Sequence, residues 1–112
     1  MAEFANVRDA KWAREKYGYI VSFTSNGMQH KAFLNKRGHC NSIIRYYGEE
    51  NLPATVRHLV KSTYYDYAIT SVIEVYHNRE TAYLVTIADK ATWKVIHIQN
   101  DEMTIRETHT KR

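Results

Sequence analysis

Six histidines and one cysteine are the side chains of this sequence that could ligate a metal ion or act as a nucleophile. They are His30, His39, Cys40, His58, His77, His97 and His109. The histidines lack the close paired spacing of a zinc site, and adjacent His39 and Cys40 would point to opposite faces of a strand. A nucleophilic thiol needs a neighbouring base, whereas Cys40 suits a small apolar position on a strand. We therefore expect no metal site and no catalytic cysteine.

Paired acids and glycine-rich loops are two other common sources of chemistry. The adjacent acids Glu49-Glu50 and Asp101-Glu102 both fall in predicted turns, where solvation accounts for them without acid–base catalysis. The four glycines are isolated from one another, so the chain has no glycine-rich phosphate loop. We therefore predict a protein that is not an enzyme and that uses no cofactor.

The net charge of +4 raises the question of a nucleic-acid partner, with tyrosines as stacking platforms. The basic residues are dispersed, however: eight basic residues accompany five acidic ones in 1–50, and eight accompany seven in 51–112. Because no basic block is present, we expect no nucleic-acid partner. No apolar run approaches the roughly 18 residues of a membrane span, so we expect no membrane insertion. A single cysteine excludes an internal disulfide and leaves the redox compartment open.

One helix and the strand after it organise the predicted fold. Asn51 is a suitable N-cap and Pro53 suits the first turn of a helix, which we expect over 52–66. From Ala68 to Tyr76 the residues are mainly β-branched and aromatic, which predicts a strand. The helix carries one apolar stripe, which would cover the sheet. The stripe consists of Leu52, Val56, Leu59, Val60 and Tyr64.

Strand and turn signals surround this helix on both sides. Asn26-Gly27 is the strongest hairpin signal in the chain. We expect strands in the later part of 6–16 and then over 17–24, 30–34, 39–47, 68–76, 82–88, 92–99 and 103–110. The chain is therefore expected to form one α+β domain over 1–112, with one antiparallel sheet on a central helix and the order ββββ-α-ββββ.

The same order of strands in the two halves indicates an internal repeat of about 1–50 and 51–112. A shift of 64 residues places 19–23 (Tyr-Ile-Val-Ser-Phe) on 83–87 (Tyr-Leu-Val-Thr-Ile) without a gap. The repeat predicts that equivalent hairpins pair in the same register.

Antiparallel pairing in these hairpins assigns the side chains to two faces of the sheet. The first face is apolar, and we expect the helix to cover it. It carries Tyr19, Val21, Phe23, Ala32, Leu34, Tyr83, Val85, Ile87, Ile96 and Ile98. The second face is mixed and carries Ile20, Ser22, Thr24, Lys31, Phe33, Leu84, Thr86, Trp93, Val95 and His97. Apolar residues on an uncovered face mark an interaction surface, so the candidate binding residues are Ile20, Phe33, Leu84, Trp93 and Val95.

Tyrosines flank the predicted helix at both ends, at 46–47 and within 64–67. They could pack under the helix with their hydroxyls in water, or form an aromatic rim for a protein partner. Packing is the commoner use of tyrosine, and we expect it here.

Several motifs resemble those of a known family. They are Asn51-Leu-Pro-Ala-Thr-Val, the run Tyr64-Tyr-Asp-Tyr-Ala-Ile-Thr-Ser-Val-Ile-Glu-Val, Tyr83-Leu-Val-Thr-Ile and Glu102-Met-Thr-Ile. Together they resemble the PepSY-like domains of Bacteroidetes, also called β-lactamase-inhibitor-protein-like (BLIP-like). The first half is similar to the leading repeat of these two-repeat proteins through Ala10-Lys-Trp, Tyr19-Ile-Val-Ser-Phe and Ala32-Phe-Leu-Asn-Lys-Arg-Gly.

The resemblance covers nearly the whole chain. It implies a helix on an antiparallel sheet, a periplasmic or secreted location, and non-enzymatic binding or inhibition of a protein or peptide, with no catalytic residues. Two alternatives stay open. One is a small-ligand carrier that uses the second face around Trp93, and the other is a structural or assembly domain without a ligand.

The repeat also predicts a second helix. The counterpart of the helix at 52–66 would lie before residue 3, so we expect a first helix that is missing or truncated, with Phe4 and Ala5 as its remnant. Without that helix, apolar residues of the first half such as Tyr19 and Val21 would lack a cover. Burial of apolar surface contributes about 25 cal/mol per Å², which would favour pairing with a second copy. We therefore expect a homodimer.

Overall fold

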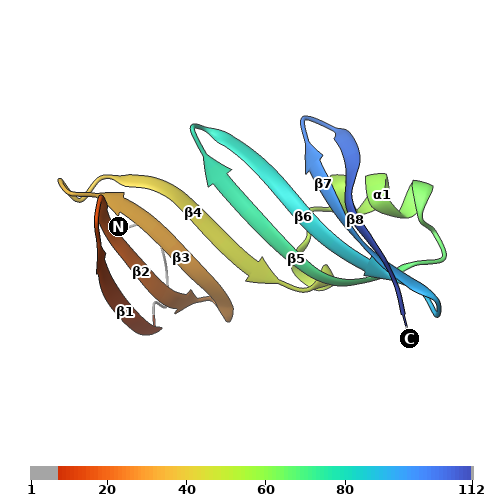
Figure 1. Ribbon diagram of the computed structural model, residues 1–112, viewed down its shortest axis with the longest axis horizontal. Coiled ribbons are helices and arrows are strands. Elements are labelled where there is room, and N and C mark those ends of the chain that lie inside the picture. The colour runs from red at the N-terminus through yellow and green to blue at the C-terminus, as the bar shows by residue number, and fades with distance from the viewer. Residues whose placement is uncertain (1–7, 112) are drawn as a thin grey trace. The chain divides into compact units, whose positions relative to one another are not determined.

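The computed structural model describes residues 8–111 of the chain. Its elements follow the order ββββ-α-ββββ, as predicted (Figure 1). They are β1 (Arg8–Glu15), β2 (Gly18–Ser25), β3 (Met28–Asn35), β4 (Cys40–Tyr47), the 3₁₀ segment η1 (Glu49–Asn51), α1 (Ala54–Thr63), β5 (Ala68–His77), β6 (Glu80–Ala88), β7 (Thr92–Gln99) and β8 (Glu102–Thr110). The strands form one eight-stranded antiparallel sheet in sequence order. The predicted α+β class is confirmed.

The chain divides into two compact units. In the described part of the chain, unit 1 comprises residues 8–46 and 75–80, and unit 2 comprises residues 47–74 and 81–111. Unit 1 therefore contains β1, β2, β3 and nearly all of β4. Unit 2 contains α1, β7, β8 and most of β5 and β6. The expectation of a single domain stays a prediction.

Helix α1 begins later than the sequence suggested. The residue before a proline is pushed out of the helical region, and Leu52 accordingly has φ −72° and ψ 132°. Pro53 is also extended and is the N-cap, so the helix starts at Ala54. The N-cap predicted at Asn51 is wrong, because Asn51 is the last residue of η1. The helix also ends at Thr63 rather than near residue 66.

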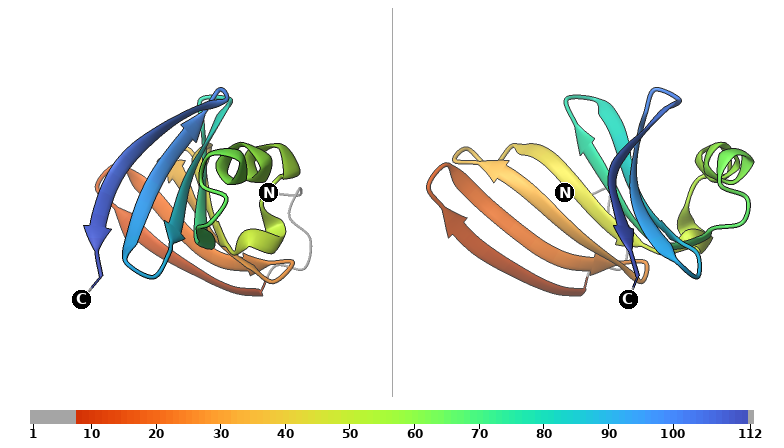
Figure 2. Two further views of the ribbon diagram at one scale, coloured as in Figure 1. Left: turned by 90° about the vertical axis from the view of Figure 1, so that its right-hand side faces the viewer. Right: turned by 45° about the vertical axis from the view of Figure 1, so that its right-hand side comes forward.

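Helix α1 packs its apolar stripe on the core of unit 2, and Figure 2 shows it on one side of the strands. Val60 is fully buried, and Val56, Leu59 and Tyr64 pack against the same core. The core residues are Leu52, Val60, Ile69, Val72, Val85, Ile87, Ile96 and Ile98. The predicted stripe is confirmed.

The apolar residues of the first half form a separate cluster in unit 1. They are Val21, Phe23, Ala32 and Leu34, with Tyr19 and Ile43 packed against them. Among the described residues, no side chain of α1 belongs to this cluster, so the expectation that one helix covers both halves needs correction. A ten-residue helix is only about 15 Å long, which suits the strands of one half. The expected first helix, with Phe4 and Ala5, lies outside the described residues.

The central hairpins of the two halves pair in the same register. Val21 of β2 lies opposite Ala32 of β3, and Val85 of β6 lies opposite Ile96 of β7. Each residue of the second pair is 64 positions from its counterpart in the first, and all four are buried. The predicted equal register of these two hairpins is therefore confirmed.

Candidate functional site

Two of the predicted binding residues lie side by side in unit 1. Ile20 of β2 is directly opposite Phe33 of β3, and both are half-buried. Their strand neighbours Val21 and Ala32 belong to the buried cluster, and successive side chains of a strand alternate between faces. Ile20 and Phe33 therefore lie on the opposite face. We call the face opposite the buried cluster the outer face of each unit, and the other the core face.

The other three predicted residues lie on the outer face of unit 2. Leu84 of β6 and Trp93 and Val95 of β7 are half-buried. The Trp93 ring stacks on the ring of His109 in β8, with centroids 4.0 Å apart and planes 15° apart. Nε2 of His109 in turn lies 2.8 Å from Oε1 of Glu107. The indole of Trp93 is thus stacked on His109, which is itself held by its contact with Glu107.

The five predicted residues are therefore divided between the two units. Ile20 and Phe33 are direct cross-strand partners in unit 1. In unit 2, Trp93 and Val95 are two residues apart on β7, and Leu84 of β6 lies opposite His97. Each group lies on the outer face of its unit.

A cavity in unit 1 adds residues that the sequence did not single out. Its volume is about 410 Å³, and it is lined by Asp9, Lys11, Ser22, Phe23, Thr24, Gln29, His30, Lys31 and Tyr46. Lys11 lies opposite Ser22, and Ser22 lies opposite Lys31, so the two lysines flank one hydroxyl in a cross-strand row. This row is on the outer face, because Ser22 alternates with the buried Val21.

Lys11 could not be assigned to this row from the sequence. The register of β1 shifts between Arg8 and Lys11, and Asp9 has a positive φ of 55° at this irregularity. Positive φ is usually signalled by glycine, and no glycine is present here. The alternation of β2 and β3 did predict Ser22 and Lys31 on one face.

His30 is a core residue of unit 1 rather than a metal ligand. It is buried and stacks on Phe23 with ring centroids 5.0 Å apart. Nε2 of His30 lies 3.2 Å from Nε of Arg45, which can only donate, and Nδ1 lies 2.9 Å from the Met28 carbonyl oxygen. Both ring nitrogens therefore have partners within unit 1.

Most of the tyrosines near the helix pack against the core, as expected. Tyr47, Tyr64 and Tyr67 pack against the core of unit 2, and the hydroxyl of Tyr47 donates to Oε1 of Glu74 at 2.6 Å. The rings of Tyr64 and Tyr67 meet edge to face with centroids 5.6 Å apart. Tyr65, in contrast, is 78% exposed.

Asp89 carries a pKa shift with a structural cause. Its Oδ1 accepts from the backbone N–H of Thr92 at 2.8 Å and of Ala91 at 2.9 Å. Hydrogen bonds to the ionised form hold the pKa of Asp89 below its ordinary value of 3.8. The carboxylate therefore closes the turn between β6 and β7.

Across residues 8–111, no three His, Cys, Asp or Glu side chains are grouped so that they could hold a metal ion. None of the helices within that range has the length and apolar character needed to cross a membrane.

No protein-family model and no curated protein matches the sequence. Solved structures do share the fold. A DUF2874 family protein from Bacteroides uniformis aligns with a TM-score of 0.67 and 14% identity over 94% of this chain and 79% of that one. A BLIP-like protein from Bacteroides fragilis aligns with a TM-score of 0.67 and 15% identity, over 94% and 76%. A "putative periplasmic" protein from Bacteroides eggerthii aligns with a TM-score of 0.67 and 12% identity, over 94% of this chain and 78% of that one.

At these identities the likeness concerns the fold. It confirms the resemblance to BLIP-like proteins at that level, whereas the PepSY-like part of the resemblance stays a prediction. The chain has the fold of the BLIP-like and DUF2874 proteins of Bacteroides.

Proposed function

We propose that this protein is a non-enzymatic, extracytoplasmic module that binds a protein or peptide on the outer face of its sheet. The observation that carries the proposal is the presence of half-buried apolar side chains on that face in both units. They are Ile20, Phe33, Leu84, Trp93 and Val95. Apolar side chains gathered on an uncovered sheet face are a usual mark of an interaction site.

Trp93 is the strongest single anchor on this face. Tryptophan is enriched among the residues that dominate binding energy, because its large ring buries much area with few rotatable bonds. The stack on His109 at 4.0 Å holds the indole in place before a partner arrives. A side chain that is already ordered loses less entropy on binding, which favours affinity.

The comparisons support the proposed location. One similar structure is of a protein named BLIP-like, and an inhibitor-type fold is compatible with a binding role. Another is called a "putative periplasmic" protein. Fold analogy alone does not transfer a function, so the outer-face residues carry the proposal and the comparisons add to it.

Peptide display against the purified chain tests the proposal. Affinities of the selected peptides would be measured for the chain and for the variants Phe33→Ala and Trp93→Ala, one in each unit. The matched controls are Tyr17→Ala and Tyr65→Ala, which remove rings that are 77% and 78% exposed. We expect an outer-face variant to weaken binding by about 2 kcal/mol, roughly thirtyfold, and the controls to bind like the parent chain. Equal affinities for all five proteins would contradict the proposal.

A second cavity favours small-ligand carriage as the alternative. Its volume is about 460 Å³, and it is lined by Trp12, Tyr19, Leu34, Lys36, Arg37 and Gly38. That volume is within the usual range of ligand pockets. Trp12 is opposite the buried Val21, so this cavity is on the core face of unit 1, and Trp93 is not among its lining residues. In a Trp93→Phe variant, saturable quenching of Trp12 fluorescence by dodecanoate would support carriage.

A further inference from the structure

We propose that the cavity on the outer face of unit 1 binds carboxylate groups of an acidic peptide segment, with Lys11 and Lys31 as the residues that hold them. This inference rests on the proposed function and deepens it, because it states the chemistry of the partner. No sequence motif indicates this site. It follows from the register of three strands.

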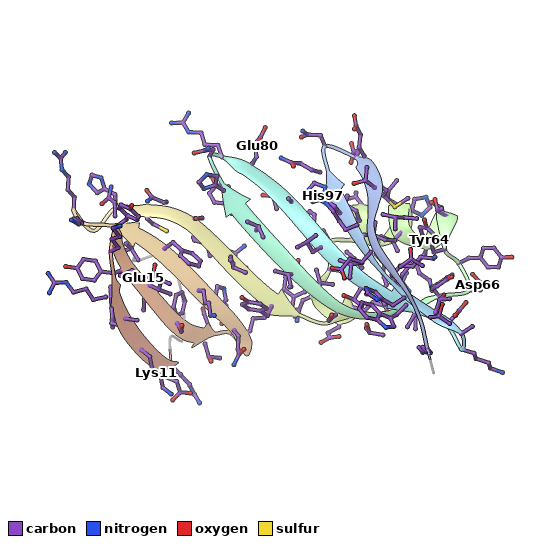
Figure 3. All side chains as sticks on the ribbon, viewed as in Figure 1. Lys11, Glu15, Tyr64, Asp66, Glu80 and His97 are labelled. Carbon is purple, nitrogen blue, oxygen red and sulfur yellow. The ribbon has the colours of Figure 1, made fainter. Side chains whose placement is uncertain are left out.

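The cross-strand row places Lys11 and Lys31 on either side of Ser22. Lys11 and Lys31 stand two strands apart, which corresponds to about 10 Å between their backbones. Lysine side chains are long and flexible, so their ammonium groups can converge on one carboxylate or hold two neighbouring ones. Figure 3 shows Lys11 projecting from β1.

Hydroxyl and amide groups surround the lysines. Ser22, Thr24, Gln29 and Tyr46 also line the cavity, and each has a side-chain group that can donate to a carboxylate oxygen. Gln29 lies opposite both Thr24 and Tyr46, so these three form the next row of the same face. A ligand with negative charge would meet donors along two adjacent rows.

The charge of the cavity is positive and its lysines are available. Within residues 8–111, neither Lys11 nor Lys31 forms a salt bridge. Asp9 is the one acid among the lining residues within that range, where the two lysines leave an excess of positive charge. An ammonium group has three hydrogen-bond donors and no acceptor, so the oxygen atoms of an incoming carboxylate can accept its hydrogen bonds.

A peptide fits this surface better than a nucleic acid does. Ile20 and Phe33 are two residues from Ser22 and Lys31 along the same strands, so an apolar pair lies directly beside the basic row. A peptide that alternates acidic and apolar side chains could place its carboxylates on the basic row and its apolar side chains on Ile20 and Phe33. A nucleic acid would need a longer track of cations and exposed stacking rings than two lysines and this pair provide.

The test uses two hexapeptides that differ only in charge, one alternating Glu with Leu and one alternating Gln with Leu. Each is titrated into the isotope-labelled chain, and dissociation constants are read from backbone amide shifts. We expect the Glu peptide to bind about tenfold more tightly than the Gln peptide, because each exposed ion pair adds about twofold to fivefold. We expect the preference to fall as salt is raised.

Charge-matched variants locate the site. The double variant Lys11→Gln/Lys31→Gln should bind the two peptides equally, whereas Lys36→Gln/Lys90→Gln, with the same net charge, should keep the tenfold preference. A preference that survives the loss of Lys11 and Lys31 overturns the inference. An oligothymidylate that binds more tightly than the Glu peptide, through the same lysines, overturns it in favour of a nucleic acid.

The outcomes also separate this inference from the proposed function. If both peptides bind with equal affinity and shift outer-face amides, the carboxylate site is wrong and the binding module stands. If neither peptide binds, the carboxylate site is wrong, and the display experiment decides the proposed function independently.

Discussion

Ile96 of β7 and Ile105 of β8 lie directly opposite each other, yet Ile96 is fully buried and Ile105 is 51% exposed. This contrast predicts unequal effects of one substitution. Ile96→Ala should lower the free energy of unfolding by about 2–5 kcal/mol, because it leaves a cavity in the core of unit 2. Ile105→Ala should lower it by less than about 1 kcal/mol. Urea unfolding of both variants measures the difference, and equal losses would contradict the assigned core.

The stack of Trp93 on His109 predicts a coupled change in stability and fluorescence. In a Trp12→Phe background, where Trp93 is the sole reporter, His109→Ala should shift the emission to longer wavelength as the indole gains contact with water. Loss of an aromatic pair should also lower the unfolding free energy by about 0.5–1.5 kcal/mol. His58→Ala, on the exposed side of α1, is the control and should change neither value.

The turn between β7 and β8 is strained at a residue that is not glycine. Asn100 and Asp101 have φ values of 53° and 62°, the pattern of a type I′ turn, which favours Asn-Gly. Asp101→Gly should therefore raise the free energy of unfolding by about 0.5–1 kcal/mol in a thermal or urea transition. Gly27→Ala is the reciprocal control, since Gly27 has φ 78° in the turn between β2 and β3 and should lose stability. Destabilisation by Asp101→Gly would show that its side chain matters more than its backbone.

Asp89 predicts a loss of stability in acid. Its pKa is lower in the folded chain than in the unfolded one, so the ionised carboxylate stabilises the fold above its ordinary pKa of 3.8. That contribution is lost as the pH falls through the lowered folded pKa. Asp89→Asn keeps an acceptor for the Ala91 and Thr92 N–H groups but cannot titrate. Between about pH 6 and about pH 2, the parent chain should lose more unfolding free energy than this variant. Parallel pH profiles would contradict the assigned hydrogen bonds.

Local patterns predicted the strands and faces well. The two-residue alternation of 19–23 and 83–87 fixed which side chains are buried, because each hairpin buries one face and a slip of one residue would expose it. The start of the helix was harder to predict. Asn51 is a good N-cap by type, but the extended backbone that Pro53 imposes on Leu52 decides where the helix begins.

The candidate site was predicted in part. The apolar residues of the outer face followed from alternation, whereas the place of Lys11 depended on a bulge at Asp9 that leaves no glycine signal. The division of the five residues between two units is a tertiary property that strand patterns do not contain. The homodimer stays a prediction, and light scattering on the chain would test it.

The central claim is that the outer face of the sheet holds a protein or peptide partner. Its most direct test is an amide and indole shift map of the isotope-labelled chain with the tightest peptide from the display selection. We predict that the largest shifts fall on outer-face residues, which are those of β2 and β3 in unit 1, or the indole N–H of Trp93 with its neighbours on β6 and β7 in unit 2. Shifts confined to α1, or to the core-face cavity lined by Trp12, would contradict the account.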